Sequence, residues 1–227
     1  MSHNRFHLQN GGIALDTTFG AVILCGGSSR RMGRDKAELT VGGETFLQRL
    51  IRELGGYPEV LLSAADSESY ARWGVPVIPD RFPHAGPAAG LQSALTSCRS
   101  DALVCVPCDL PLFSKELGDA LCAALRPEDH AAVVETRDGR IHPLCGVYRR
   151  EAAPILERCL TQGTRRMRDI LGQMRVRTFA LADTPYGDEL VTNLNTPEEY
   201  RQFCRLTGDI AFADELPEEE MRTCLSR

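Results

Sequence analysis

The chain has 227 residues, of which 43% are hydrophobic and 25% charged, the composition of an ordinary globular protein. This length suits one large domain or two small ones. The net charge of -5 argues against a protein whose main task is to hold DNA or RNA, because that task usually needs a net basic face. No apolar run approaches the ~20 residues of a membrane-spanning helix.

Short apolar runs alternate with amphipathic helical patterns along the chain. The apolar runs predict buried strands at residues 21–25, 59–64, 75–79, 102–107 and 131–135. The helical patterns predict helices at residues 45–54, 86–95 and 114–125, the last with Ser114 as its N-cap. This alternation predicts an α/β fold: a three-layer, Rossmann-like, doubly wound and mostly parallel sheet with right-handed crossovers.

The domain organisation expected is a single domain over residues 20–206, because no repeat and no linker-like segment divides the chain. Residues 1–19 predict a flexible N-terminal extension, and residues 207–227 an acidic C-terminal tail. Nine scattered cysteines, an odd number without a secretory signal, favour reduced thiols and a cytoplasmic location. Cys105 and Cys108 have the spacing of half a zinc site, but no second half follows at a suitable distance.

Polar residues follow several of the predicted strands, where open α/β sheets bind their ligands. Ser63 and Asp66 close the second strand, and Asp80 follows the third. Asp109 follows the fourth strand within "VPCDLP", where a carboxylate before a proline turn is well placed to hold Mg²⁺. It lies five residues before Ser114, too far to cap the next helix.

The first strand leads into "LCGGSSRRMGRDK", residues 24–36, with three glycines, three arginines and a lysine. Free backbone amides and cationic side chains point to an anion with several charged oxygens, such as the phosphate chain of a nucleotide. A basic surface turn has a similar composition. The Walker pattern GxxxxGK[ST] and the dinucleotide pattern GxGxxG are both absent, which argues against a P-loop kinase or a dehydrogenase.

This glycine-rich segment is similar to the signature LAGGxSxRMGxDK of the molybdenum cofactor guanylyltransferases (MobA-type), a branch of the nucleotidyltransferases with a Rossmann-like α/β fold. The likeness continues, in order, through "IPDRFPHAGPAAGL", "PCDLP", "HPLCGVY" and "NLNTPEEY". It covers roughly residues 20 to 203, and the ordered set of five segments is far more specific than any one of them.

The resemblance implies that the chain transfers GMP from GTP to molybdenum-bound molybdopterin, releasing pyrophosphate and making the guanine dinucleotide form of the cofactor. Positioning and charge neutralisation do nearly all the work in such a transfer. It also implies Mg²⁺ as the cofactor. The partners implied are the cofactor-insertion enzyme and acceptor molybdoenzymes, with no nucleic acid and no membrane.

The site residues carried over from the resemblance fall into three groups. The catalytic positions are Arg31, Lys36 and Asp109, of which Asp109 would hold the metal. The nucleotide-binding positions are Leu24, Cys25, Gly26, Gly27, Lys36, Ser63, Asp80 and Asp109. Possible contacts to the pterin phosphate are Arg166, Asn193 and Asn195. Two positions depart from the family: Cys25 replaces an alanine, and Ser63 stands where an asparagine is usual, which removes one amide from the base or ribose contacts.

Structural interpretations compete with some of these assignments. Asn193 and Asn195 would also suit a turn and a helix N-cap ahead of "TPEEY". The basic segment at residues 163–171, which includes Arg166, would also suit a solvated helix face. We interpret His142 and Tyr148 as strand and pocket-wall residues, because an anionic phosphate nucleophile needs no catalytic base.

Three other functions remain open from the sequence. A cytidylyltransferase of the same cofactor pathway is disfavoured by the paired glycines and by Asp35 before Lys36. A sugar-phosphate nucleotidyltransferase has a similar opening loop but is usually a longer chain. A non-catalytic nucleotide-binding adaptor is disfavoured because Lys36 and Asp109 are both present.

Overall fold

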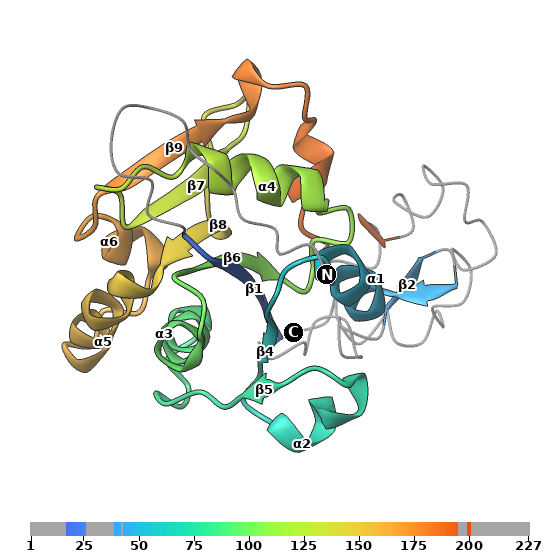
Figure 1. Ribbon diagram of the computed structural model, residues 1–227, viewed down its shortest axis with the longest axis horizontal. Coiled ribbons are helices and arrows are strands. Elements are labelled where there is room, and N and C mark those ends of the chain that lie inside the picture. The colour runs from blue at the N-terminus through green and yellow to red at the C-terminus, as the bar shows by residue number, and fades with distance from the viewer. Residues whose placement is uncertain (1–16, 26–38, 42, 195–198, 201–227) are drawn as a thin grey trace, which may run out of the picture.

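A seven-stranded sheet forms the centre of the computed structural model (Figure 1), which describes residues 17–25, 39–41, 43–194 and 199–200. The strand order is β5-β4-β1-β6-β8-β7-β9. The strands are β1 (Phe19–Leu24), β4 (Val60–Ser63), β5 (Val77–Ile78), β6 (Ala102–Pro107), β7 (Ala131–Glu135), β8 (Ile141–Arg149) and β9 (Val176–Ala180). Strands β2 (Thr40–Val41) and β3 (Glu44–Thr45) form a separate antiparallel pair.

The sheet is parallel except around β8. Strand β1 pairs in parallel with β4 and β6, β4 with β5, and β7 with β9, whereas β8 runs antiparallel to both β6 and β7. All five predicted strands are present, with ends that shift by up to two residues. The predicted mostly parallel α/β sheet is therefore confirmed.

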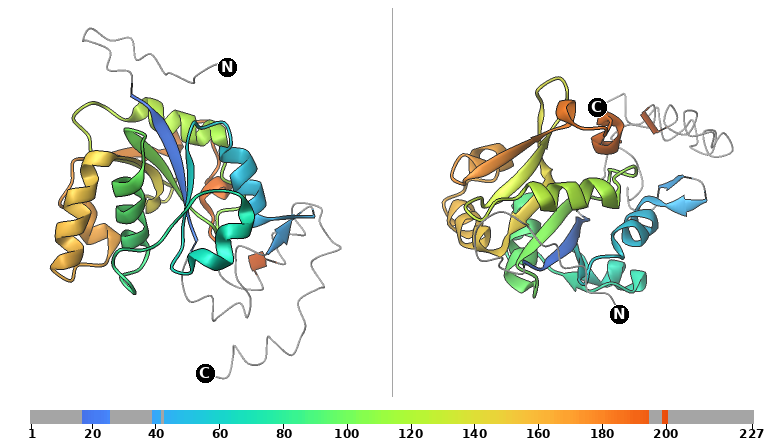
Figure 2. Two further views of the ribbon diagram at one scale, coloured as in Figure 1. Left: turned by 60° about the horizontal axis from the view of Figure 1, so that its bottom comes forward. Right: turned by 45° about the horizontal axis from the view of Figure 1, so that its top comes forward.

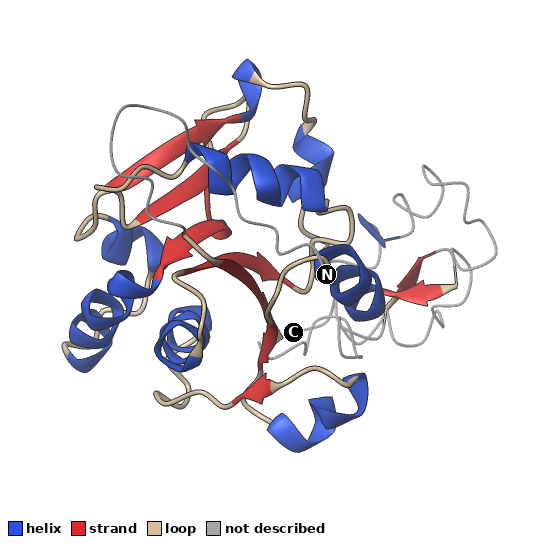
Figure 3. Ribbon diagram, in the orientation of Figure 1, coloured by secondary structure: helices blue, strands red, loops and turns tan. Residues whose placement is uncertain are grey.

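Helices cover both faces of this sheet and complete three layers (Figure 3). They are α1 (Phe46–Leu54), α2 (Ser67–Tyr70), α3 (Pro87–Ser97), α4 (Lys115–Ala124), α5 (Ala153–Thr161) and α6 (Met167–Leu171). Along β1 the buried side chains alternate: Ala21 and Ile23 join the apolar cluster of α1 and α4, while Val22 and Leu24 join that of α3, α5 and α6. Helices α3 and α5 lie side by side on the second face (Figure 2).

The helix ends follow the local sequence. Thr45 caps α1 with a complete capping box, in which its side chain accepts from the Gln48 amide and Gln48 accepts from the Thr45 amide. Ser114 accepts a hydrogen bond from the Leu117 amide at 3.3 Å, so the predicted N-cap of α4 is confirmed. Asp109 is thereby left outside the cap.

Strand β8 carries an irregularity beside the carboxyl edge of the sheet. Its partners on β7 jump from Gly146, opposite Val133, to His142, opposite Val134, so the intervening residues bulge. Gly146 permits this close pairing, because a Cβ there would lie 2.4 Å from the Ala132 carbonyl oxygen. The fully buried Tyr148 donates a hydrogen bond to the carbonyl of Pro143 within the bulge.

His142 and Tyr148 both lie on strand β8, as the sequence predicted. The prediction that Tyr148 lines a pocket is wrong. Tyr148 is 0% exposed and packs in the apolar cluster of α3, α5 and α6. Burial and the neighbouring Arg140 lower the pKa of His142, which favours a neutral imidazole at neutral pH.

The described part of the chain begins just before β1. The Thr18 amide and hydroxyl both donate to Asp101, at 2.9 and 2.8 Å, and β1 starts at Phe19. The last residues of the segment predicted as an extension therefore belong to the folded domain. Residues 1–16 and the predicted acidic tail lie outside the described residues.

Two findings bear on the class of protein. Among the described residues, no helix is both long and apolar enough to cross a membrane. The cysteines within them are buried free thiols: Cys25, Cys98, Cys105, Cys108, Cys122, Cys145 and Cys159. Burial raises the pKa of Cys98 to about 11, which keeps this thiol protonated and unreactive at neutral pH.

Candidate active site

The register of the parallel strands brings several polar residues to one edge of the sheet. Leu24, the last residue of β1, lies opposite Ser63 on β4 and Pro107 on β6, while Ser63 lies opposite Ile78 on β5. The residues that follow these strands therefore meet at the carboxyl edge, where open α/β sheets bind ligands.

Backbone hydrogen bonds continue this pairing beyond the strand ends. The Cys25 amide donates to the Ser63 carbonyl at 2.7 Å, and the Cys108 amide donates to the Leu24 carbonyl at 3.1 Å. The chain leaving β1 is thus fixed to both of its neighbours at the point where the glycine-rich segment begins.

A pocket of about 600 Å³ opens at this edge, next to the ends of β1 and β4. It is lined by Leu24, Cys25, Ser63, Ala65, Asp66, Tyr70, Asp80, His84, Gly86, Pro87 and Gly90. Its volume is in the range of small-molecule and cofactor sites. Four of the predicted nucleotide-binding residues thus share one pocket: Leu24, Cys25, Ser63 and Asp80.

Ser63 and Asp80 form the polar pair of this pocket. The Ser63 hydroxyl donates to Oδ1 of Asp80 at 3.2 Å, and Ser63 is only 3% exposed. Burial raises the pKa of the Asp80 carboxyl, and the Ser63 hydrogen bond opposes that shift. A half-buried carboxylate with a raised pKa in a pocket is typical of a functional group rather than of a stabilising one.

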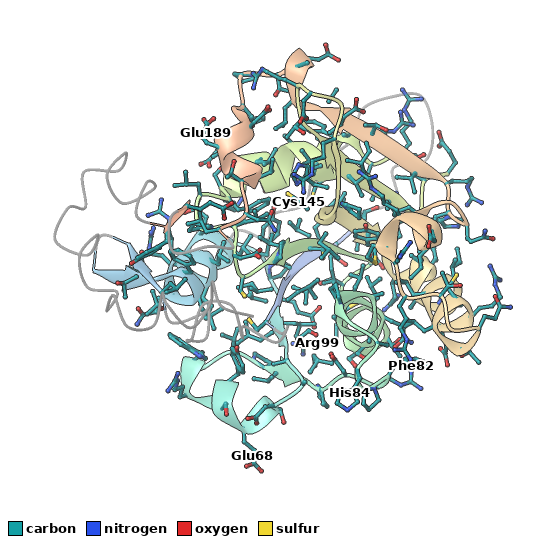
Figure 4. The ribbon with its side chains drawn as sticks, turned by 180° about the vertical axis from the view of Figure 1, so that it is seen from behind. Glu68, Phe82, His84, Arg99, Cys145 and Glu189 are labelled. Atoms are coloured by element: carbon teal, nitrogen blue, oxygen red, sulfur yellow. The ribbon has the colours of Figure 1, made fainter. Side chains whose placement is uncertain are left out.

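The start of α3 forms another wall of the pocket, through Gly86, Pro87 and Gly90. Gly86 occupies the N-cap position with a φ of 77°, a left-handed conformation that suits glycine, and Pro87 begins the helix. Figure 4 shows His84 on the segment that leads into α3, with Glu68 on the outer side of α2. The amides at the start of a helix and the helix dipole favour a negatively charged or hydrogen-bond-accepting group at this wall.

The basic segment before α6 touches this wall through Arg165 rather than through Arg166. Nη1 of Arg165 donates to the His84 carbonyl at 3.4 Å. Arg166, the predicted pterin-phosphate contact, occupies the N-cap position of α6 and is exposed. Helix α6 itself packs through Met167 and Ile170 into the core.

Asp109 lies just beyond β6 and is half-buried. The Asn193 side chain donates from Nδ2 to Oδ1 of Asp109 at 3.1 Å, and the Leu194 amide donates to the Asp109 carbonyl at 3.1 Å. Two predicted site residues are therefore brought together from distant parts of the chain. Asp109 does not line the pocket of Ser63 and Asp80. The end of β1 lies between Asp109 and that pocket.

Some predicted site residues cannot be located. Gly26, Gly27, Arg31, Lys36 and Asn195 lie outside the described residues.

The sequence reasoning also missed part of the pocket. Tyr70, His84 and Gly90 line it, yet only Gly90 had a recognisable signal, since an isolated glycine inside a helical pattern often has a packing or functional reason. Asp66, noted as a strand-end residue, lines the pocket and caps α2, accepting from the Ser69 amide at 3.3 Å.

Comparisons with known proteins agree with this fold and show the family. The model of the MobA-like NTP transferase domain matches residues 21–178. The molybdenum cofactor guanylyltransferase of Rhizobium johnstonii is 35% identical over 187 residues, which cover 78% of this chain and 88% of that protein. The protein of the same name from Vibrio cholerae is 31% identical over 185 residues, covering 80% and 89%.

A solved structure shows the same fold. It is the molybdopterin-guanine dinucleotide biosynthesis protein A of Archaeoglobus fulgidus, which superimposes with a TM-score of 0.74 at 21% identity over 83% of this chain and 98% of that chain. The family model spans more than half of the chain and includes most of β1 and all of β4, β5 and β6, the strands that lead to the pocket and to Asp109. The chain therefore belongs to the family of MobA-like NTP transferase domains.

Proposed function

We propose that this chain transfers GMP from GTP to molybdenum-bound molybdopterin and releases pyrophosphate. The observation that carries the proposal is the order of the strands at the carboxyl edge. The pocket of Ser63 and Asp80 lies on the β4 side of β1, and Asp109 lies on the β6 side. The glycine-rich segment leaves β1 between them, so a nucleotide with its base in the pocket can extend its phosphates toward Asp109.

Asp80 is the group that we assign to the base. Guanine presents two adjacent donors, N1–H and N2–H₂, and a carboxylate offers acceptors that suit them. Ser63 holds one oxygen of Asp80 at 3.2 Å and so helps to orient the carboxylate. Adenine and cytosine lack this pair of donors and would leave a half-buried acceptor unmatched, at a cost of ~1–3 kcal/mol per group.

Asp109 and Asn193 have the chemistry of a Mg²⁺ site. Mg²⁺ prefers one or two protein oxygens together with substrate phosphate oxygens. The Asn193 amide uses Nδ2 to hold Asp109, which leaves its Oδ1 as an oxygen ligand beside the carboxylate. Bound there, Mg²⁺ would neutralise phosphate charge that otherwise repels an anionic nucleophile. The residues present therefore fit this metal.

We assign the other predicted site residues to positioning the phosphates and neutralising their charge. We assign the triphosphate to Arg31, Lys36 and the amides of Gly26 and Gly27. The acceptor phosphate is assigned to Asn195 and Arg166. A terminal phosphate oxygen of the pterin attacks the α-phosphorus and forms a new P–O bond, while the bond from that phosphorus to the bridging oxygen breaks and pyrophosphate leaves. The nucleophile is already anionic, so no general base is needed.

We also propose that the reaction takes place in the cytoplasm and that the product passes to the cofactor-insertion enzyme and to acceptor molybdoenzymes. These partners follow from the resemblance to the guanylyltransferases, and they are tested by co-purification rather than by nucleotide binding.

Nucleotide choice tests the proposal. With Mg²⁺ present, calorimetric titration should show GTP binding at least about tenfold more tightly than CTP or ATP, the value of one mismatched group. CTP binding as tight as GTP binding would favour the cytidylyltransferase. Binding of none of the three would contradict the proposal, whereas binding of GTP without Mg²⁺-dependent release of pyrophosphate would favour the nucleotide-binding adaptor.

A further inference from the structure

The backbone around Asp80 receives little support from the sheet. Strand β5, which precedes it, has two residues and lies at the edge, paired to β4 at Leu62↔Val77 and Ser63↔Ile78. Asp80 follows β5 at the start of the segment that leads to α3. An edge strand this short does not by itself fix a carboxylate beyond its end, so other contacts must do so.

Helix α3 supplies one of these contacts through Ser93. The Arg81 amide donates to the Ser93 hydroxyl oxygen at 2.9 Å, and Ser93 is 0% exposed. Ser93 lies in the middle of a helix whose other buried residues are mainly alanine and leucine. A buried hydroxyl among such residues is tolerated when it is hydrogen-bonded, and here its partner is the peptide group directly after Asp80.

Gly90 lies three residues earlier on the same face of α3. A Cβ at Gly90 would lie 2.3 Å from the Ser63 hydroxyl oxygen and 3.4 Å from Oδ1 of Asp80. The first distance is shorter than real contacts allow, so any larger residue would displace the Ser63 hydroxyl from its place beside Asp80. The glycine therefore keeps open the space in which the Ser63–Asp80 hydrogen bond forms.

We infer that Ser93 and Gly90 are positioning residues that set guanine specificity by holding Asp80 in place. The inference rests on the proposed function. Ser93 fixes the backbone on the far side of Asp80, and Gly90 lets Ser63 fix the carboxylate from the pocket side. One face of α3 thus controls both the position and the orientation of the group that meets the base. Neither residue touches the reacting phosphates.

Inosine triphosphate (ITP) is the probe for this inference, because it differs from GTP only by the missing 2-amino group. The wild-type preference for GTP over ITP, measured as the ratio of the two dissociation constants with Mg²⁺, reports the hydrogen bond from that amino group. We expect a ratio of about ten, which corresponds to the loss of one hydrogen bond to a charged acceptor. In Ser93→Ala and Gly90→Ala the ratio should fall below about three, because the carboxylate is no longer held toward the base.

Thr96→Ala is the matched control, since it also removes a hydroxyl from α3. The hydrogen bonds of the Thr96 hydroxyl are to Gln92 and not to the segment of Asp80. It should keep the wild-type ratio. Ser93→Thr retains the hydroxyl and should restore most of the ratio lost in Ser93→Ala. Thermal unfolding of each variant establishes that the protein measured is folded, and Gly90→Ala provides the test if Ser93→Ala does not fold.

The inference is overturned if Ser93→Ala and Gly90→Ala leave the ratio of the two dissociation constants unchanged. A purely structural role would have this result, because it would weaken the binding of GTP and of ITP equally. Failure of the proposed function looks different: the wild-type protein itself would then show no preference for GTP over ITP, CTP and ATP.

Discussion

Asn193 donates a hydrogen bond from Nδ2 to Oδ1 of Asp109 at 3.1 Å, although the two residues are 84 positions apart in the chain. The next amide, that of Leu194, donates to the Asp109 carbonyl. Both the side chain and the backbone of Asp109 are therefore held by a segment that follows the last strand of the sheet. This contact joins two residues that we place in the same metal site.

The first prediction concerns this pair. Asp109→Asn should keep the fold and lose at least about 100-fold in pyrophosphate release, because a neutral amide no longer neutralises the metal and phosphates as a carboxylate does. Asn193→Ala should lose about tenfold, since it removes one hydrogen bond to a charged group. Thr192→Ala, at the exposed position next to it, is the control. Near-normal turnover in Asp109→Asn would contradict the metal assignment.

The second prediction concerns the glycine-rich segment. Lys36→Ala and Arg31→Ala should each weaken GTP binding or turnover by about tenfold or more, because each removes a charge-assisted contact to phosphate. Arg34→Ala should have little effect, since Arg34 falls at a position that the signature LAGGxSxRMGxDK leaves open. Titration calorimetry and pyrophosphate release at two salt concentrations measure these effects. Equal losses in all three variants would indicate a diffuse basic patch instead of a shaped phosphate site.

The third prediction is a pH dependence that comes from Asp80. Because burial raises its pKa, lowering the pH from neutrality should protonate it before an exposed aspartate. The preference for GTP over ITP should then decline, as one acceptor is lost. In Ser63→Ala the decline should begin at a higher pH, because the Ser63 hydrogen bond lowers this pKa. A ratio that stays flat between neutral and acidic pH in both proteins would rule Asp80 out as the base contact.

The raised pKa of Asp80 also affects the stability of the folded protein. A carboxyl whose pKa is higher in the folded state than in the unfolded chain stabilises the fold only when protonated, and that contribution is lost as the pH rises through the folded pKa. At pH 7 the ionised Asp80 is therefore a cost to folding. Asp80→Asn should melt at the same temperature as the wild type or higher at pH 7, while losing its preference for GTP. A lower melting temperature would show that Asp80 is a structural group.

The fourth prediction concerns Gly146 in β8. Alanine at this position would place a Cβ 2.4 Å from the Ala132 carbonyl oxygen, in the middle of the sheet. Overpacking of this kind costs ~1–3 kcal/mol, and the rigid backbone partner favours the upper part of that range. Gly163→Ala, at an exposed turn with a φ of 83° and open space around it, should cost less. Urea unfolding measures the free energy of unfolding of both variants. An equal loss in the two variants would contradict the prediction.

The sequence predicted the carboxyl edge of the sheet because two local rules were enough. Apolar runs marked the strands, and the residues that follow parallel strands must meet at one edge. The meeting of Cys25, Ser63 and Asp80 therefore needed no knowledge of side-chain contacts. Ser114 was likewise predictable as an N-cap, since the signal is confined to a few residues around the start of a helix.

Contacts between distant segments were beyond such rules. The apolar residues of β8 give the same pattern whether the strand runs parallel or antiparallel, so its reversal between β6 and β7 could not be predicted. The same is true of Gly90, which in the sequence is a glycine inside a helical pattern. Its role depends on where Ser63 points, and this is set by the packing of α3 against β4.

The position of Asn193 has a consequence for how the protein is made. Among the described residues, those that line the pocket lie between positions 24 and 90, and the four parallel strands around it are complete by Pro107. A chain still emerging from the ribosome thus contains all of the described pocket lining before half of its length has been synthesised. The partner that holds Asp109 arrives only with residue 193. A product that stops short of residue 193 keeps the described lining of the pocket but lacks the hydrogen bond that holds the Asp109 carboxylate.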